Sequence, residues 1–335
     1  MKKILVLGGT GAMGIYLIPE LVRMGYAVDV VSLDEMASPD PALRYIKANA
    51  MDVNYIEGLL KNGYDGIVDF MIYKTPQFKE RYKLFLDNTD HYIYLSSYRI
   101  YADSPVITET SPRLLDVSDN QEYLSTEDYS LFKARGEDIL TASDYDNYTM
   151  IRPAITFSSF RYQLVTLEAN VFIDRMFKGR TVLLPEAALD VQATMSWAGD
   201  VAKMIARLLF AKHAMKETYT LATAEHQSWG EVAGYYREIG GLKILPVDTE
   251  TYLKMHTGSE QIDRHCRWQL DYDRLFNRVV DNRKILDAVG MKQSELMRVK
   301  DGLRMELGRL PKGYVWPASR TNDMMDAYLA ERGMV

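Results

Sequence analysis

Residues 2–35, KKILVLGGTGAMGIYLIPELVRMGYAVDVVSLDE, decide the fold. Ile4 to Leu7 form a continuous apolar run, which is typical of a parallel strand buried on both faces. Three glycines spaced three apart follow, and then an apolar pattern of helical period runs from Ile15 to Met24, where Gly25 can end the helix. A second strand is predicted from Ala27 to Val31. This order of strand, glycine turn, helix and strand predicts the start of a parallel α/β sheet.

The glycines of the turn indicate a site for a dinucleotide. A pyrophosphate rests on backbone N–H groups at a helix N-terminus, where any side chain would hold it away. The alternative is that these glycines serve only the turn and the packing of helix on strand. We expect contacts to a cofactor from the turn as a whole, namely Gly8, Thr10, Gly11, Ala12, Met13 and Gly14.

The end of the second strand bears on which dinucleotide is bound. An acidic residue there holds the ribose hydroxyls of NAD, whereas a basic residue accommodates the 2′-phosphate of NADP. The residues in reach are Ser32 and Asp34, with no Lys or Arg near them, so NAD is favoured over NADP. Asp52, which follows a third predicted strand (44–47), is a candidate for the adenine amino group. It is equally a candidate for the N-cap of a helix over residues 53–60.

The alternation of strand and helix continues along the chain. Residues 66–72 and 92–95 are short apolar runs separated by a polar helical stretch, 77–87. This pattern predicts a Rossmann-type, doubly wound parallel sheet, in which ligands bind outside the carboxyl ends of the strands. Because the run 92–95 is followed by Ser96 and Ser97, a hydroxyl at this strand end is positioned to meet a substrate.

Composition narrows the classes of protein. The 335 residues carry a net charge of −6 and a single cysteine, Cys266, and the pI is about 5.5. This acidic balance disfavours nucleic acid, whose binding needs clustered Lys and Arg. One cysteine excludes an internal disulfide framework and fits a reducing compartment, and Cys266 beside His265 lacks the further ligands of a metal site. No signal peptide or membrane span is evident, so a cytoplasmic location is expected.

Four motifs in order carry a resemblance to a known family. GGTGAMG (8–14), LSSYRIY (95–101), VITETSP (106–112) and YSLFK (129–133) resemble the extended and atypical short-chain dehydrogenases/reductases. Within that superfamily, the motifs resemble those of the NAD-dependent epimerase/dehydratase family, whose members act mainly on nucleotide sugars. Later segments, among them MIRPAITF (150–157) and SWAGDVAKMI (196–205), extend the resemblance to about residue 310.

The resemblance implies a catalytic set of Ser97, Tyr129 and Lys133. A Tyr-x-x-x-Lys spacing is expected roughly once by chance in such a chain, and its value depends on the neighbouring motifs. Residues four apart share a helix face, so the Lys133 ammonium is expected beneath the Tyr129 hydroxyl, where it favours the phenolate. Tyr129 then takes a proton from a substrate hydroxyl while hydride passes to NAD, and Ser97 binds the same oxygen. The remaining implied cofactor contacts are Phe70, Met71, Ser96, Lys133 and Pro153.

The residues after Ser97 bear on the reaction. Nucleotide-sugar 4,6-dehydratases have an Asp-Glu pair where this sequence has Tyr98 and Arg99, which argues against dehydration. The function expected is therefore an NAD-dependent epimerase or oxidoreductase that oxidises a secondary alcohol of a nucleotide sugar through a keto intermediate. The alternatives are a net NAD(P)-dependent reductase or dehydrogenase, or a cofactor-bound, non-catalytic RNA-binding or regulatory protein, as some atypical members are.

The rest of the chain is expected to build a smaller α/β substrate domain. The predicted division is residues 1–155, with 196–222 returning, for the NAD-binding domain, and 156–195 and 223–320 for the substrate domain. Residues 321–335 are a C-terminal tail with a short helix, and a homodimer is compatible with the sequence. Guanidinium groups match a diphosphate, and the candidates to bind one are Arg161, Arg175, Arg264 and Arg267, although a solvated charged turn is the alternative for each.

Overall fold

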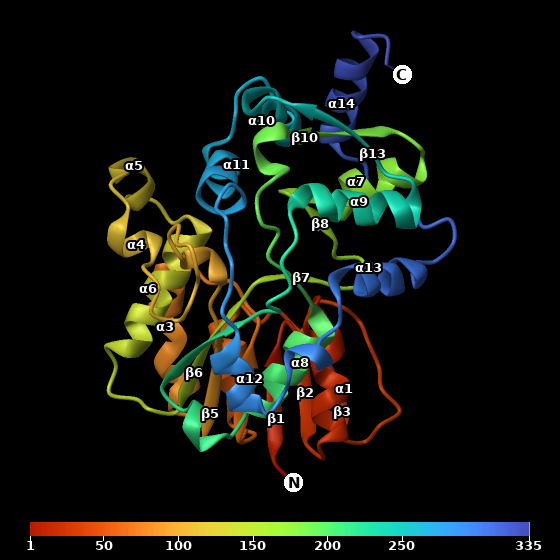
Figure 1. The fold of residues 1–335 in the computed structure, drawn as a ribbon. Coiled ribbons are helices and arrows are strands. Elements are labelled where there is room, and N and C mark those ends of the chain that lie inside the picture. Colours follow the sequence, from red (N-terminus) through yellow and green to blue (C-terminus); the bar gives the residue numbers. More distant parts are fainter. Residues whose placement is uncertain (335) are drawn as a thin grey trace.

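The computed structural model describes residues 1–334, and its lower half in Figure 1 is a seven-stranded parallel sheet. The strands run in the order β12-β6-β5-β4-β1-β2-β3, and every neighbouring pair is parallel. From β1 the chain winds first through β2 and β3 and then through β4, on the other side, so a crevice opens beyond the carboxyl ends of β1 and β4. The bounds are β1 (Lys3–Leu7), β2 (Ala27–Ser32), β3 (Leu43–Lys47), β4 (Gly66–Asp69), β5 (His91–Leu95), β6 (Tyr148–Pro153) and β12 (Glu217–Leu221).

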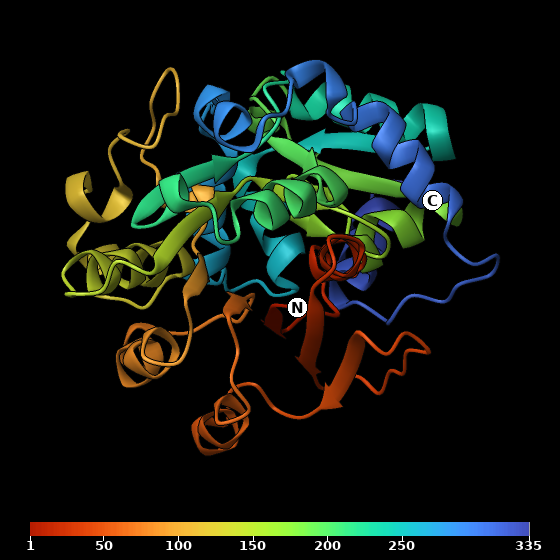
Figure 2. The same ribbon diagram turned by 90° about the horizontal axis from the view of Figure 1, so that it is seen from below.

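Helices cover both faces of this sheet. Ile4 and Val6 point to one face, which packs on α1, α8 and α12, while Leu5 and Leu7 point to the other, which packs on α2, α3 and α6. In Figure 2 the orange helices α2 and α3 accordingly lie across the strands from α8. Burial on both faces explains the unbroken apolar run of β1. The helices are α1 (Gly14–Arg23), α2 (Val53–Leu60), α3 (Thr75–Leu86), α6 (Tyr129–Thr141), α8 (Ala198–Leu208) and α12 (Arg283–Val289).

The second part of the molecule stands above the sheet in Figure 1 and has its own core. Its parallel pairs are β10 (Thr181–Pro185) with β13 (Lys243–Val247) and β7 (Ile155–Phe157) with β11 (Met195–Trp197). A short antiparallel pair joins β8 (Gln163–Leu164) to β9 (Leu167–Glu168). Its helices are α7 (Ala169–Phe177), α9 (Trp229–Gly240), α10 (Thr249–Thr257), α11 (Arg264–Gln269), α13 (Val299–Gly308) and α14 (Arg320–Ala330). Two short helices, α4 (Leu114–Val117) and α5 (Gln121–Leu124), precede α6.

The expected fold class, a doubly wound α/β sheet with a smaller second part, is confirmed. β12 lies beside β6 in the sheet, and α8 packs on α1. The predicted domain division, with residues 196–222 returning to the NAD-binding domain, stays a prediction. α7 begins only at Ala169, because Val165 has a φ of 55° and turns the chain between β8 and β9. Among the helices of residues 1–334, none combines the length and apolar character that a bilayer crossing requires.

The segment expected as a C-terminal tail is a packed helix over most of its described length. In α14, Met325 and Leu329 lie in the core of the second part. Arg175 of α7, almost fully buried, pairs with Asp326 at 2.8 Å and donates to the carbonyl of Asn322. α14 is therefore an integral element of the second part.

Candidate active site

The glycine turn is packed too tightly for side chains. Gly8 has a φ of 72° and its N–H donates to Val31 at 2.9 Å. A Cβ on Gly14 would lie 1.9 Å from the carbonyl oxygen of Gly9. The first turn of α1 has neither a side-chain cap nor an acidic residue. An uncapped helix start behind a glycine-rich turn fits the pyrophosphate of a dinucleotide.

We expect a Gly14→Ala variant to lower the free energy of unfolding by about 1–3 kcal/mol and to weaken dinucleotide binding, because the added methyl group displaces the turn. Urea denaturation and calorimetric titration measure the two effects. The control is Gly58→Ala in α2, where an added Cβ meets nothing within 4 Å and helix propensity gives a gain of up to about 1 kcal/mol. Unchanged dinucleotide affinity in Gly14→Ala would contradict the assignment of this turn.

The residues expected at the ribose lie together at the end of β2. The Thr10 and Ser32 hydroxyls are 2.6 Å apart, and Asp34 is joined to Ser32 by bonds of 3.1 and 3.3 Å. Asp34 is exposed and can accept from a ligand. Asp52 caps α2 by accepting from the N–H of Tyr55 at 3.1 Å, so the capping alternative is realised; its contact with adenine stays a prediction.

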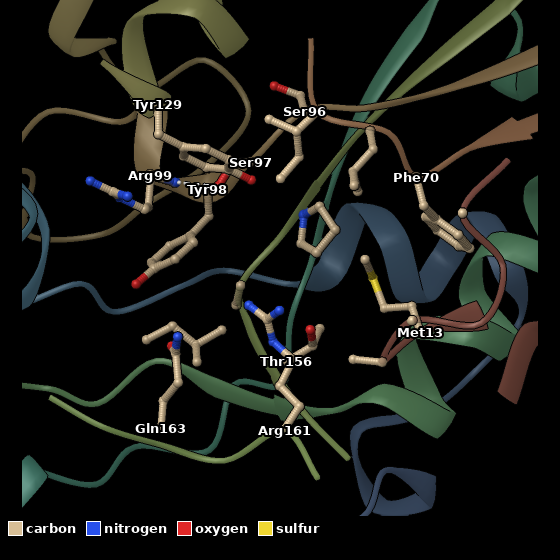
Figure 3. Close-up of a pocket in the computed structure, with 18 of the residues that line it drawn as sticks. Met13, Phe70, Ser96, Ser97, Tyr98, Arg99, Tyr129, Thr156, Arg161 and Gln163 are labelled. Atoms are coloured by element: carbon tan, nitrogen blue, oxygen red, sulfur yellow. Dashed lines mark hydrogen bonds between the residues drawn. The ribbon is translucent and has the colours of Figure 1, made fainter. Parts of the chain in front are cut away.

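A cavity of about 320 Å³ opens between the carboxyl ends of the strands and the second part (Figure 3). It brings together most of the expected site residues, which are Gly8, Gly11, Ala12, Met13, Gly14, Phe70, Ser96, Ser97, Tyr129, Pro153 and Arg161. Sequence reasoning did not assign Tyr98, Arg99, Thr156, Gln163, Glu168 or Arg274, which also line it. The glycine turn, Ser97 and Tyr129 thus line the same cavity.

Tyr129 and Ser97 lie side by side at the cavity wall in Figure 3. Tyr129 is the first residue of α6, whose N-cap is Asp128, and its hydroxyl has no hydrogen bond to residues 1–334. Ser97 follows β5 and accepts from the N–H of Arg99 at 3.2 Å. The Ser96 Oγ is buried and has no partner in the same residues. The hydroxyl groups of Tyr129 and Ser97 can therefore both donate to a ligand oxygen in the cavity.

Lys133 lies one turn along α6 from Tyr129, and does not line the cavity. It is 1% exposed, and its Nζ donates to the carbonyls of Leu95 at 2.5 Å and Met71 at 3.5 Å. The Nζ is 5.9 Å from the centre of the Tyr129 ring. Burial lowers the pKa of Lys133 to about 8, and burial raises the pKa of Asp69, at the end of β4, to about 6. Lys133 thus joins the ends of β4 and β5 beneath the site.

The four candidate arginines lie in different places. Arg161 points into the cavity across from Tyr129 in Figure 3. Arg264 and Arg267 pair with Glu122 and Glu250 outside the cavity. Arg175 is committed to Asp326, as described above. The structure therefore brings only Arg161 to the candidate site.

We expect Arg175→Met to lower the free energy of unfolding by about 2–4 kcal/mol, because it removes a buried charge and its hydrogen bonds. Arg180→Met is the matched control, since Arg180 pairs with the same Asp326 but is 53% exposed and should cost below about 1 kcal/mol. Chemical denaturation measures both. A loss of ligand affinity in Arg175→Met without a loss of stability would instead support a contact with substrate.

A buried carboxylate links α1, the helix that follows the glycine turn, to the second part. Glu306 of α13 is fully buried and accepts from the Tyr16 hydroxyl of α1, from the Trp197 indole at 2.6 Å and from the Ser159 hydroxyl at 2.7 Å. Ser159 lies in the loop that carries Arg161. Arg309, three residues along the chain, also pairs with Glu306 at 3.5 Å. Nothing in the local sequence indicated the link to α1, because Tyr16, Trp197 and Ser159 come from distant segments.

Comparisons with known proteins agree with the fold. No family model matches the chain. The structure is similar to UDP-glucose 4-epimerase of Thermotoga maritima with UDP-glucose, at a TM-score of 0.64 and 15% identity over 91% of this chain and 97% of that one. It is also similar to UDP-glucose 4-epimerase of Thermus thermophilus in complex with NAD, at a TM-score of 0.62 and 16% identity over 91% and 98%. The chain has the fold of the UDP-glucose 4-epimerases. This confirms, at the level of fold, the resemblance carried by the four motifs.

One relative by sequence is named for binding stem-loops and not as an epimerase. The chloroplast stem-loop binding protein of 41 kDa b of Arabidopsis thaliana is 22% identical over 256 residues. The match covers 72% of this chain and 64% of that protein. The epimerase fold is therefore found in a chain whose sequence is also related to a stem-loop binding protein.

Proposed function

We propose that this protein is an NAD-dependent oxidoreductase of the epimerase type, which oxidises a secondary alcohol of a nucleotide sugar to a ketone and reduces it again. One observation carries the proposal: Tyr129 and Ser97 share a cavity with a glycine turn built for a dinucleotide. The similar structures, two of UDP-glucose 4-epimerases, one of them in complex with NAD, support the same choice of cofactor and substrate class.

The residues present fit the cofactor. The backbone of Gly8–Gly14 would hold the pyrophosphate, and Ser32 with Asp34 would hold the adenosine ribose. Phe70, Ser96 and Pro153 line the cavity where the nicotinamide would lie. Bound NAD would supply hydride exchange with the carbon that bears the alcohol.

The side chains would divide the proton chemistry. Tyr129 takes the hydroxyl proton and later returns it, while Ser97 donates to the same oxygen as it becomes a carbonyl. Lys133, whose pKa is lowered to about 8 by burial, remains largely charged at neutral pH. Its ammonium lies beneath the Tyr129 ring, 5.9 Å from the ring centre. No carboxylate lies next to Ser97 in sequence to eliminate water, so alcohol–ketone chemistry is expected.

The test is to identify and measure the cofactor. We expect the denatured, purified protein to release NAD, and calorimetry to show tighter binding of NAD than NADP. Release of NAD would support a closed redox cycle such as epimerisation. If the purified protein contains no dinucleotide and exchanges added dinucleotide freely, a net dehydrogenase or reductase would be favoured. Binding of neither dinucleotide would refute the oxidoreductase assignment.

The second candidate is a cofactor-bound RNA-binding protein, and the sequence similarity to the stem-loop binding protein favours it. The net charge of −6 weighs against it. Filter binding of a stem-loop RNA at two salt concentrations distinguishes the candidates, and tight, salt-sensitive binding would support the second. The cytoplasmic location and the homodimer stay predictions from the sequence.

A further inference from the structure

Arg99 is held in the wall of the candidate site with its hydrogen-bonding capacity unused. Its side chain is 15% exposed, and its guanidinium donates no hydrogen bond to residues 1–334. Its Nε is buried 3.4 Å from Asp273 without hydrogen-bond geometry, and Asp128 is 4.0 Å away. A guanidinium has five N–H donors, and buried donors are satisfied in most structures, so the state of Arg99 requires an explanation.

The neighbouring arginines show that acceptors are not scarce in this region. Arg274 donates to the carbonyl of Val165 at 2.7 Å and to Gln163 at 3.1 Å. Arg278 donates to the carbonyls of Tyr98 and Tyr101 at 2.9 and 2.7 Å. In both residues the terminal guanidinium nitrogens donate to the protein, although the Nε of Arg278 also lacks a partner. The guanidinium of Arg99, by contrast, donates no hydrogen bond to residues 1–334. Its donors are therefore available to a ligand.

The position of Arg99 connects it to the reacting end of the cavity. Its guanidinium carbon is 5.2 Å from the centre of the Tyr129 ring, and its backbone N–H holds the Ser97 hydroxyl. Figure 3 shows the three residues together on one side of the cavity. The charges that line the cavity are Arg99, Arg161 and Arg274 against the single carboxylate of Glu168, which Gln163 binds. Behind this lining, Asp128 and Asp273 lie beside Arg99, and Arg274 and Arg278 share Asp273. Among these groups the guanidinium ions outnumber the carboxylates by one.

We propose that Arg99 binds a carboxylate of the substrate beside the reacting hydroxyl, so that the preferred sugar is a hexuronate. The proposal rests on the proposed function, because it places the reacting oxygen between Ser97 and Tyr129. A carboxylate offers two oxygens in the geometry that a guanidinium fork matches, and it supplies the hydrogen bonds that Arg99 lacks. A neutral hexose leaves these donors unpaired on binding, which discriminates against it.

The experiment compares acidic and neutral ligands on the NAD-loaded protein. Calorimetry with UDP-glucuronate and UDP-glucose is one pair, and saturation-transfer NMR with free glucuronate and glucose is a pair independent of the nucleotide. We expect the acidic member to bind at least about thirtyfold more tightly, and Arg99→Gln to remove this preference. Arg99→Lys keeps the positive charge but not the two parallel N–H donors of the guanidinium, so it should retain part of the preference for the acidic ligand. It replaces Arg99→Gln as the test variant if Arg99→Gln does not fold. Arg264→Gln, outside the cavity, is the matched control.

The outcomes separate the subsite from the reaction. Absence of an acid preference in both pairs, or its persistence in the Arg99 variants, overturns the carboxylate subsite. Turnover of neutral sugars without a preference for acidic ones would overturn the carboxylate subsite but would leave the proposed oxidoreductase function standing. Acid preference that depends on Arg99, without hydride exchange, would support the subsite and count against the proposed function.

Discussion

A Tyr129→Phe variant is expected to lose turnover by a factor of about 10²–10⁴, which is the usual contribution of a positioned acid–base group. The proton of the substrate hydroxyl then has no acceptor, while Ser97 and the glycine turn are untouched. Because the Tyr129 hydroxyl has no hydrogen bond to residues 1–334, its removal should change the free energy of unfolding by less than about 0.5 kcal/mol. Single-turnover hydride exchange, NAD titration and urea denaturation measure the three quantities.

The matched control is Tyr55→Phe, since Tyr55 is 40% exposed on α2 and remote from the cavity. It should retain full turnover. Near-normal turnover in Tyr129→Phe would remove Tyr129 from the reaction. A loss of NAD affinity as large as the loss of turnover would assign the hydroxyl to binding rather than to proton transfer.

A Lys133→Met variant is expected to lose turnover by about a hundredfold, because the ammonium that lies 5.9 Å from the centre of the Tyr129 ring disappears. Its stability should depend on pH differently from that of the wild type. In the folded protein the pKa of Lys133 is lowered to about 8 from an ordinary value of 10.5, so the folded state holds this proton less tightly than the unfolded chain. The cost of the buried ammonium is full below pH 8 and disappears as pH rises from 8 to 10.5.

The stability of the wild type relative to Lys133→Met should therefore rise between pH 8 and 10.5, by up to about 3 kcal/mol. Denaturation of both proteins at pH 7.5 and at pH 10.5 measures this change. Lys178→Met, at a lysine that is 55% exposed and paired with Asp174, should show no comparable change. A constant difference between wild type and Lys133→Met across the interval would mean that the ammonium is not buried as described.

The sheet and the glycine turn were predictable because local pattern determines them. The apolar run Ile4–Leu7 needs burial on both faces, and the glycine spacing needs a close turn, so both appear within a few residues of sequence. The hairpin at Val165 was not predictable, since a β-branched residue at positive φ is adopted only when tertiary packing imposes it. The same holds for α14, whose docking depends on Arg175, some 150 residues away in sequence.

The candidate site was predictable only in part. Ser97 and Tyr129 were found because their spacing to the glycine turn resembles a family pattern. Arg99 was noticed only as the residue that replaces a carboxylate, and its place over Tyr129 depends on how a short turn after β5 meets the start of α6. Arg175 and Arg267 match a diphosphate by chemistry alone, but their carboxylate partners belong to other elements and hold them outside the cavity.

The carboxylate of Glu306 couples the cofactor side of the cavity to its sugar side. It holds Tyr16 of α1 and Ser159 of the loop that carries Arg161 through one buried group. Any displacement of α1 would therefore be passed to the loop that faces the sugar. We accordingly expect the sugar nucleotide to bind more weakly to protein freed of its dinucleotide than to the NAD-loaded protein, which calorimetry on the two forms measures.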